Sequence, residues 1–173
     1  DKNRSCTLKD LFPLFNIPGL KWFNLQTGHA SDQAKDLRIP INMVNLGERF
    51  HGFNDTAGVI ENLDLVISVD TAVAHLAGAM AKPIWLLLPY SPDWRWLHDR
   101  QDSPWYPTMR LFRQPDPNKW PATVQSVRDA LQVLLQEEKK TEVYQNNVVP
   151  INSLQDNHRD KFRLGQGNSP KKA

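Results

Sequence analysis

The 173-residue sequence has little of several features that would mark a particular class of protein. Cys6 is its only cysteine, which excludes an internal disulfide and favours a reducing compartment, so we expect a cytoplasmic protein. The formal net charge is only +2 and the basic residues are scattered, so we expect no nucleic-acid interface. No apolar run reaches the roughly 18 residues of a membrane span, and no basic-then-apolar leader is visible; we therefore expect neither a span nor a signal peptide.

The motifs of several enzyme classes are also absent. The sequence contains no metal-ligand spacing, P-loop, nucleophile elbow or GxGxxG fingerprint. A P-loop NTPase or a classical dehydrogenase is therefore not expected, and we predict neither a bound metal nor a cofactor.

The most informative stretch runs from Leu63 to Leu88. Its residues Leu65–Val69 are apolar and rich in β-branched side chains, which predicts a buried strand. From Thr71 onward the apolar residues fall at helical spacing, and the helix should end before Pro83. Ile84–Leu88 is a second apolar run. Strand, helix and strand in so short a stretch predict a βαβ unit, which joins parallel strands.

Similar patterns predict further elements on both sides of this unit. We predict helices at residues 7–15, 55–63 and 124–135 and strands at residues 20–25, 39–46 and 109–113. This alternation indicates an α/β, Rossmann-like fold with a mainly parallel sheet and helices on both faces. A doubly wound half normally opens with a strand, yet a helix comes first here, so we expect the first strand to be missing. We place one Rossmann-like domain at residues 1–136 and a polar, disordered tail at residues 137–173.

A ligand site is predicted where the first strand of the βαβ unit meets its helix, because open α/β sheets bind ligands at that edge. The helix amino terminus offers free N–H groups and partial positive charge, so a diphosphate can dock at Thr71 to Ala74. His75 lies on the same helical face and can reach the same ligand. We expect Asp70 to cap the helix or to accept hydrogen bonds from sugar or ribose hydroxyls. The alternative is a capped helix with an ordinary, partly buried histidine.

Residues 89–107 form a long segment with four prolines and three tryptophans, which is typical of a functional loop. Aromatic faces stack on sugars, which suggests carbohydrate contacts for five side chains of this segment: Trp94, Trp96, His98, Trp105 and Tyr106. Asp93 or Arg95 can bond the sugar hydroxyls. The alternatives are a small aromatic core that pins the loop to the sheet, which we expect for at least one of the three tryptophans, and surface ion pairs for the charged residues.

The run SVDTAVAHLAGAMAKPIWLLLPYSPDWRWLHDRQDSPWYPTMRLFRQ resembles the carboxyl-terminal half of glycosyltransferases of the ADP-heptose:lipopolysaccharide heptosyltransferase family. More closely, it resembles the glycosyltransferase-like domain at the end of many bacterial tetratricopeptide-repeat proteins. The resemblance extends from Lys2 to Leu135 and rests on the Asp-Thr-x-x-x-His-Leu-Ala signature at Asp70 to Ala77, with the PDWRW and DSPWYP segments. The family usually carries Gly after the Thr, where this sequence has Ala72.

The resemblance implies one half of a GT-B fold, the half that holds a nucleotide-diphosphate-sugar donor for a transfer without a metal. The expected donor contacts are Lys2, Arg4 and Ser5, which the resemblance implies; Gln26 and Glu48, which end strands on the same edge of the sheet; and Asp70, Thr71, Ala72 and His75 at the helix end. A solvated terminus and ordinary strand-end turns are the alternatives for the first five of these residues. The implied catalytic base lies in the amino-terminal half, which we expect outside this chain.

The resemblance also implies partners. They are the donor, a protein or glycan acceptor, and either the amino-terminal GT-B half or tetratricopeptide repeats. The alternative function is a non-catalytic interaction module whose tryptophan-rich loop, residues 89–107, binds a protein or glycan.

Overall fold

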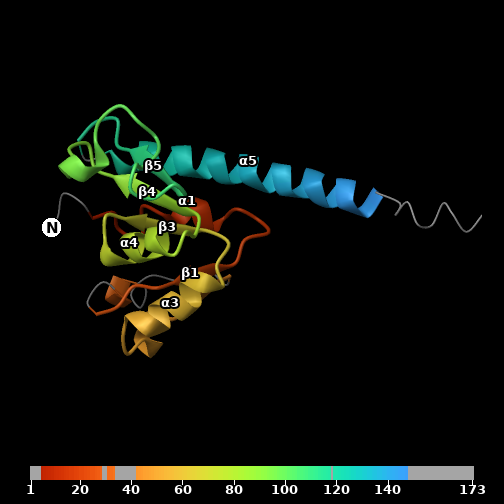
Figure 1. Cartoon of the computed structure of the whole chain (residues 1–173), viewed down its shortest axis with the longest axis horizontal. Coiled ribbons are helices and arrows are strands. Elements are labelled where there is room, and N and C mark those ends of the chain that lie inside the picture. The colour runs from red at the N-terminus through yellow and green to blue at the C-terminus, as the bar shows by residue number, and fades with distance from the viewer. Residues whose placement is uncertain (1–4, 29–30, 34–41, 118, 148–173) are drawn as a thin grey trace, which may run out of the picture. The chain divides into compact units, whose positions relative to one another are not determined.

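The computed structural model describes residues 5–28, 31–33, 42–117 and 119–147, the last six of them as backbone only (Figure 1). The chain divides into two compact units, residues 1–132 and 133–173. The strands described are β1 (Trp22–Asn24), β2 (Met43–Asn45), β3 (Val66–Val69), β4 (Ile84–Leu88) and β5 (Met109–Arg113). The helices are α1 (Phe12–Phe15), α3 (Phe53–Glu61), α4 (Ala72–Ala79) and α5 (Trp120–Asn147), with 3-10 helices η1 (Gly47–Arg49) and η2 (Trp94–Trp96).

The predicted βαβ unit is present as β3, α4 and β4. β3 pairs in parallel with β4, with Val66 opposite Ile84, and β4 pairs in parallel with β5, with Ile84 opposite Met109. Every residue of β4 is buried, as expected of a strand that has a neighbour on each edge and cover on each face. The strand predicted at residues 109–113 is thereby confirmed as β5.

β1 and β2 form a second parallel sheet, with Trp22 opposite Met43. Every strand pair described is therefore parallel, which confirms the predicted α/β fold. In the doubly wound order 3-2-1-4-5-6, β2 and β1 correspond to the third and second strands, and β3, β4 and β5 to the fourth, fifth and sixth. Within the described parts of the chain no strand joins β1 to β3, and that position belongs to the first strand, which we expected to be missing.

The core of the first unit combines one face of the β3–β4–β5 sheet with helices α3 and α4. Its members are buried and apolar: Ile60, Val66, Ala74, Ala77, Ile84, Leu86, Leu88, Trp96, Met109 and Leu111. Alternate residues of a strand point to the same face, which explains the contribution of Ile84, Leu86 and Leu88. Small alanines on α4 let this helix lie close to the sheet. The core therefore fixes the amino end of α4 against the carboxyl end of β3.

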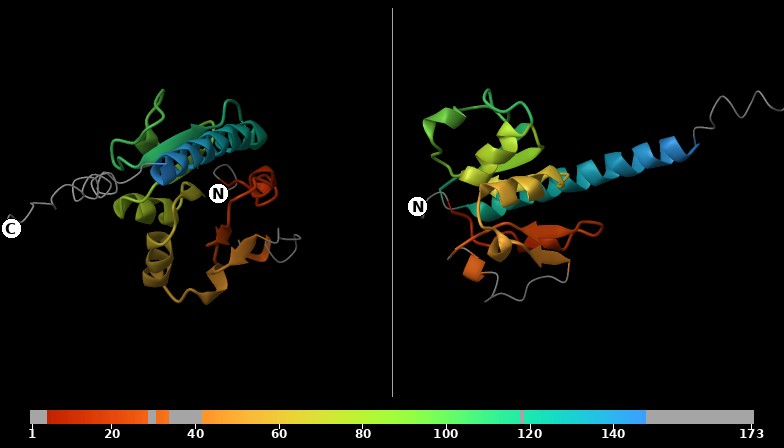
Figure 2. Two further views of the ribbon diagram at one scale, coloured as in Figure 1. Left: turned by 90° about the vertical axis from the view of Figure 1, so that its right-hand side faces the viewer. Right: turned by 60° about the horizontal axis from the view of Figure 1, so that its bottom comes forward.

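Helix α5 is longer than predicted. It begins at Trp120 and ends at Asn147, whereas the apolar pattern predicted a helix over residues 124–135 only (Figure 2). Val124, Val127 and Leu131 are buried as the pattern requires. The polar residues after them continue the helix because Glu, Gln and Lys are good helix formers even without a buried face. The predicted tail thus begins inside a helix, and its residues 148–173 lie outside the described residues.

The first helix is shorter than predicted. α1 covers only Phe12–Phe15, because Pro13 suits the first turn of a helix but not its interior. The residues before α1 form turns, in which the Asp10 carboxylate accepts a hydrogen bond from the Thr7 N–H at 2.9 Å. Leu8 and Phe15 are nevertheless buried, as the apolar pattern predicted.

The other predicted elements near the start also differ slightly at their ends. α3 begins at Phe53 rather than Asp55, and β1 and β2 are shorter than their predicted runs. Residues 39–41 of the second run lie outside the described residues. No helix in the described part of the chain has both the length and the apolar character needed to cross a membrane.

Candidate functional site

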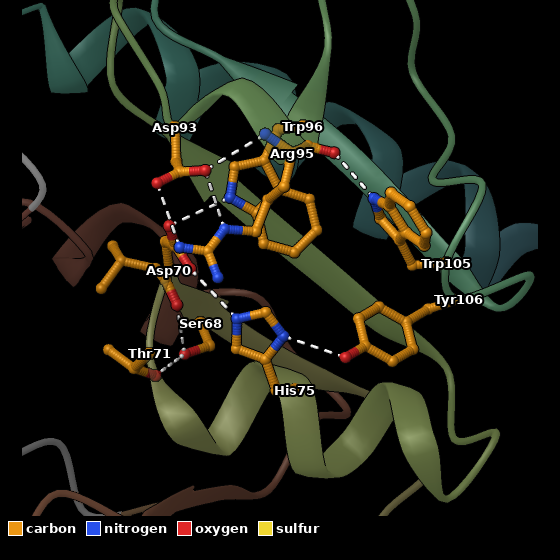
Figure 3. Close-up of polar contacts among 10 residues, drawn as sticks. Ser68, Asp70, Thr71, His75, Asp93, Arg95, Trp96, Trp105 and Tyr106 are labelled. Atoms are coloured by element: carbon orange, nitrogen blue, oxygen red, sulfur yellow. Dashed lines mark hydrogen bonds and ion pairs between the residues drawn. The ribbon is translucent and has the colours of Figure 1, made fainter.

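The candidate site lies where β3 ends and α4 begins (Figure 3). Thr71 holds the N-cap position with extended backbone, and its hydroxyl lies 3.0 Å from the Ser68 hydroxyl. Thr71 and Ala72 are exposed. Because the first N–H groups of a helix have no acceptor within it, this exposed end of α4 is suited to an anion.

The prediction that Asp70 caps α4 was wrong. Thr71 takes that position, and Asp70 is buried with 8 % of its surface exposed. Its Oδ2 accepts a hydrogen bond from Nε1 of Trp96 at 3.0 Å, and its Oδ1 lies 3.4 Å from Nε2 of His75. A buried carboxylate is costly unless donors surround it, and these side chains supply them. Asp70 therefore supports its neighbours in the site rather than the helix end.

His75 projects from the second turn of α4 and is held on three sides. Nε2 faces Asp70, and Nδ1 lies 3.0 Å from the Tyr106 hydroxyl. The ring stacks on Trp96, with centroids 5.4 Å apart and planes 25° apart, and meets Tyr106 edge-on (Figure 3). Both ring nitrogens thus have protein partners. A neutral His75 can bond a ligand only by exchanging one of them.

Tyr106, one of the loop aromatics considered above for a sugar, also belongs to the site. Its ring packs against α4 at Gly78, where an added Cβ would lie only 2.5 Å from Cγ of Tyr106. Glycine therefore makes room for the ring, and the ring carries its hydroxyl to His75. The pairing joins residues 31 positions apart, so no local pattern indicates it. The sequence indicated Tyr106 only as one of the loop aromatics that could contact a sugar, without its bond to His75.

The tryptophan-rich loop is ordered around one buried indole. Trp96 is fully buried, which confirms that at least one of the three tryptophans is core, whereas Trp94 and Trp105 are 77 % and 57 % exposed. Nε1 of Trp105 donates to the carbonyl of Arg95 at 2.9 Å. Nη2 of Arg113, on β5, donates to the carbonyl of Trp96 at 2.6 Å. These bonds fix the loop beside the site and leave two indoles open.

Arg95 brings a positive charge to the site. Asp93 accepts from its side chain at 2.8 Å and 3.0 Å, and accepts from its backbone N–H at 3.1 Å. The pKa of Arg95 is raised chiefly by this side-chain hydrogen bond, and the charges of Asp93 and Asp70 raise it further. Arg95 is thus a member of the cluster around Asp70, as well as the partner in the surface ion pair that we expected as an alternative.

The remaining predicted contacts lie elsewhere. Gln26 follows β1 and Glu48 lies in η1 after β2, so both belong to the end of the smaller sheet. These two strand ends are in contact, because Gly47 lies against the carbonyl of Gln26. Ser5 is exposed and outside any helix or strand, and Lys2 and Arg4 lie outside the described residues. The structure therefore brings together Asp70, Thr71, Ala72 and His75 with part of the tryptophan-rich loop.

Within the part of the chain that the structure describes, no three His, Cys, Asp or Glu side chains gather as a metal site would require. The cluster consists instead of one buried carboxylate, an imidazole, a phenol, a guanidinium and a helix end. Such groups bind anions and hydroxyls.

Comparison with known proteins agrees with this chemistry. Residues 34–96 match glycosyltransferase family 9 (heptosyltransferase), and this range contains β3, α4, β4 and η2. The chain is also 30 % identical over 123 residues to Protein FlbA of Caulobacter vibrioides, an alignment that covers 69 % of this chain and 20 % of that protein. The chain thus spans about a fifth of this relative. No solved structure matches the chain. The core of the candidate site, from the end of β3 through η2, therefore lies in a heptosyltransferase-like segment.

Proposed function

We propose that the chain binds the nucleotide-diphosphate sugar of a glycosyltransferase that works without a metal, as the donor-binding half of a GT-B enzyme. The observation that carries the proposal is the exposed amino end of α4 at the carboxyl end of β3. This is the edge at which open α/β sheets bind ligands. The match of residues 34–96 to a glycosyltransferase family supports the same site.

The diphosphate would lie against the first turn of α4. The N–H groups of Ala72 and Val73 and the hydroxyl of Thr71 are donors, and the helix adds partial positive charge. Arg95 adds a full positive charge beside them. The negative charge of Asp70 is buried and bonded to Trp96, which reduces its repulsion of the phosphates. Charge that develops on the leaving diphosphate would be stabilised by the same donors.

The sugar and the nucleoside would extend from this point in two directions. Trp105 offers an exposed indole near Arg95 and is our candidate for stacking on a sugar. Asp93 and Trp94 remain candidates for further contacts at the loop. Gln26 and Glu48, at the ends of β1 and β2, remain proposals for the ribose or the base.

Binding is the activity that this chain should show by itself. The base that activates the acceptor is expected in the other half of the GT-B fold, outside residues 1–173. That half, or tetratricopeptide repeats, would be the partner that completes the enzyme. We therefore expect nucleotide-sugar binding with little or no transfer.

Isothermal titration of the folded chain with ADP-, UDP- and GDP-sugars tests the proposal. We expect one of them to bind, and we expect Thr71→Val to weaken it by roughly three- to tenfold, because one hydroxyl donor is lost. Ser126→Ala, on the exposed face of α5, is the matched hydroxyl control and should bind as the unaltered protein does. Failure of all three classes to bind at millimolar concentration would exclude the proposal.

A second candidate function is an interaction module that uses the tryptophan-rich loop. The observation in its favour is the exposure of Trp94, at 77 %, and of Tyr90, at 56 %. Exposed aromatic side chains are common at binding surfaces. The two functions separate by substitution: loss of affinity for the nucleotide sugar in His75→Ala supports the first, whereas binding of a protein or glycan that needs Trp94 but not His75 supports the second.

A further inference from the structure

Asp70, His75 and Tyr106 form a line of polar contacts that ends at the partly exposed Tyr106. We propose that the Tyr106 oxygen accepts a hydrogen bond from a hydroxyl of the donor sugar, and that His75 positions Tyr106 instead of binding the diphosphate. The inference rests on the proposed function and deepens it. It also replaces the role that the sequence alone suggested for His75, which was direct contact with the ligand.

We assign the tautomer of His75 from the buried end of the line. Asp70 accepts from Trp96 through Oδ2, and its Oδ1, which can only accept, lies 3.4 Å from Nε2 of His75. This contact favours a neutral His75 with its proton on Nε2, which leaves Nδ1 with a lone pair. The Tyr106 hydroxyl, 3.0 Å away, therefore donates its single proton to Nδ1.

The Tyr106 hydroxyl has one proton, and that proton is used in the hydrogen bond to Nδ1 of His75. Toward a ligand the Tyr106 oxygen can therefore only accept. Phosphate oxygens at neutral pH are acceptors too, so a diphosphate finds no donor at Tyr106. A sugar hydroxyl carries a proton and fits the free lone pairs of the Tyr106 oxygen. The same reasoning applies to His75, whose Nδ1 is an acceptor in this tautomer. The phosphates are thus left to the amino end of α4 and to Arg95.

Packing holds Tyr106 in place before any ligand arrives. Its ring lies against Gly78 on α4 and against the edge of His75. Trp105, the preceding residue, is bonded through its indole N–H to the carbonyl of Arg95. The exposed indole of Trp105 and the fixed phenol oxygen of Tyr106 therefore belong to consecutive residues. Aromatic stacking with one directed hydrogen bond is the chemistry that recognises a sugar ring.

The test compares each nucleotide sugar with its own nucleoside diphosphate. UDP-glucose is titrated beside UDP, ADP-glucose beside ADP, and GDP-mannose beside GDP, into the unaltered chain and into Tyr106→Phe, at pH 8. We expect Tyr106→Phe to weaken the nucleotide sugar by roughly three- to tenfold and to leave the diphosphate unchanged. An equal loss for both ligands would overturn the inference but not the proposed function. If the unaltered chain binds neither ligand, both the proposed function and this inference are wrong.

Two further measurements distinguish the loss of a hydrogen bond to the sugar from a general disturbance of the structure by Tyr106→Phe. Nitrogen NMR of His75 should show a protonated Nε2 and an unprotonated Nδ1 in the ligand-free chain; a proton on Nδ1 would overturn the inference. Gly78→Ala keeps the tyrosine hydroxyl but forces the ring away from α4, because the new Cβ would lie 2.5 Å from Cγ of Tyr106. It should reproduce the selective loss for the nucleotide sugar, and unchanged affinity for both ligands would count against the proposal.

Discussion

Nε1 of Trp96 donates a hydrogen bond to Oδ2 of Asp70 over 3.0 Å, and so joins the loop after β4 to the end of β3. Both residues are buried, and the same indole stacks on His75. The loop is thus attached to the site through its only buried tryptophan among the three. The position of the exposed loop residues Trp94 and Trp105 depends on this attachment.

Trp96→Phe should therefore destabilise the fold. It leaves a buried carboxylate oxygen without its donor and a small cavity in the core, which together cost about 2–4 kcal/mol in the free energy of unfolding. Trp94→Phe is the matched control, because Trp94 is 77 % exposed, and it should change the free energy by less than about 0.5 kcal/mol. Urea unfolding followed by circular dichroism measures both. Equal effects of the two substitutions would show that the buried bond is unimportant.

Arg113, on β5, should keep the tryptophan-rich loop ordered. Its side chain donates to the carbonyls of Trp96 and Arg100, at 2.6 Å and 3.2 Å. Arg113→Met removes both bonds and keeps much of the apolar stem, so the amides of residues 94–101 should exchange faster with deuterium. Lys119→Met, at an exposed lysine, is the control and should leave the exchange of this segment unchanged. The attachment is contradicted if residues 94–101 remain equally protected in Arg113→Met.

Gly47 and Gly58 should respond oppositely to alanine. An added Cβ at Gly47 would overlap the carbonyl oxygen of Gln26, so the ends of β1 and β2 must separate. We expect Gly47→Ala to lower the free energy of unfolding by about 2 kcal/mol or more. Gly58 lies in α3 with nothing within 4 Å of the new atom, and alanine there should stabilise the helix by up to about 1 kcal/mol. Thermal unfolding of the two variants tests both signs, and a neutral Gly47→Ala would contradict the close approach.

Cys6 should be a slow nucleophile. Burial first, and then the charge of Asp10 and a hydrogen bond to it, raise the pKa of the Cys6 thiol from 9.0 to about 12. The reactive thiolate is therefore scarce at pH 8, and alkylation by iodoacetamide should be at least about a hundredfold slower than in the urea-unfolded chain. The rate should rise as the pH approaches 12, and Asp10→Asn should increase it at pH 8. Equal rates in the folded and unfolded chains would refute this.

The sequence predicted the elements whose signal is local. The strand at Val66–Val69, helix α4 and strand β4 follow from apolar runs and a change of period, and the structure confirms each of them. Helix α5 extends beyond its prediction because residues 136–141 are exposed, and a pattern of burial cannot show where a helix with such residues ends. α1 was predicted too long because Pro13 outweighs an apolar period.

The site was predicted in its position but not in its bonding. The exposed helix end at Thr71 follows from the strand-to-helix turn. The roles of Asp70 and His75 do not, because their partners Trp96 and Tyr106 come from a loop that folds back over 20 or more residues. The sequence required one buried tryptophan in that loop without indicating which. Burial, rather than residue type, separates Trp96 from Trp94 and Trp105.

The most direct test of nucleotide-diphosphate binding at α4 is an NMR titration of the isotope-labelled chain with UDP-, ADP- and GDP-sugars. The amide signals of Ala72, Val73 and Ala74 should shift with increasing concentration of the ligand that binds, because their N–H groups lie at the amino end of the helix. Amides of the distant residues 125–131 of α5 serve as the internal control. Saturable shifts at residues 72–74 are the predicted result. Saturable binding whose shifts avoid these three amides, or no shift at millimolar ligand, would contradict the account.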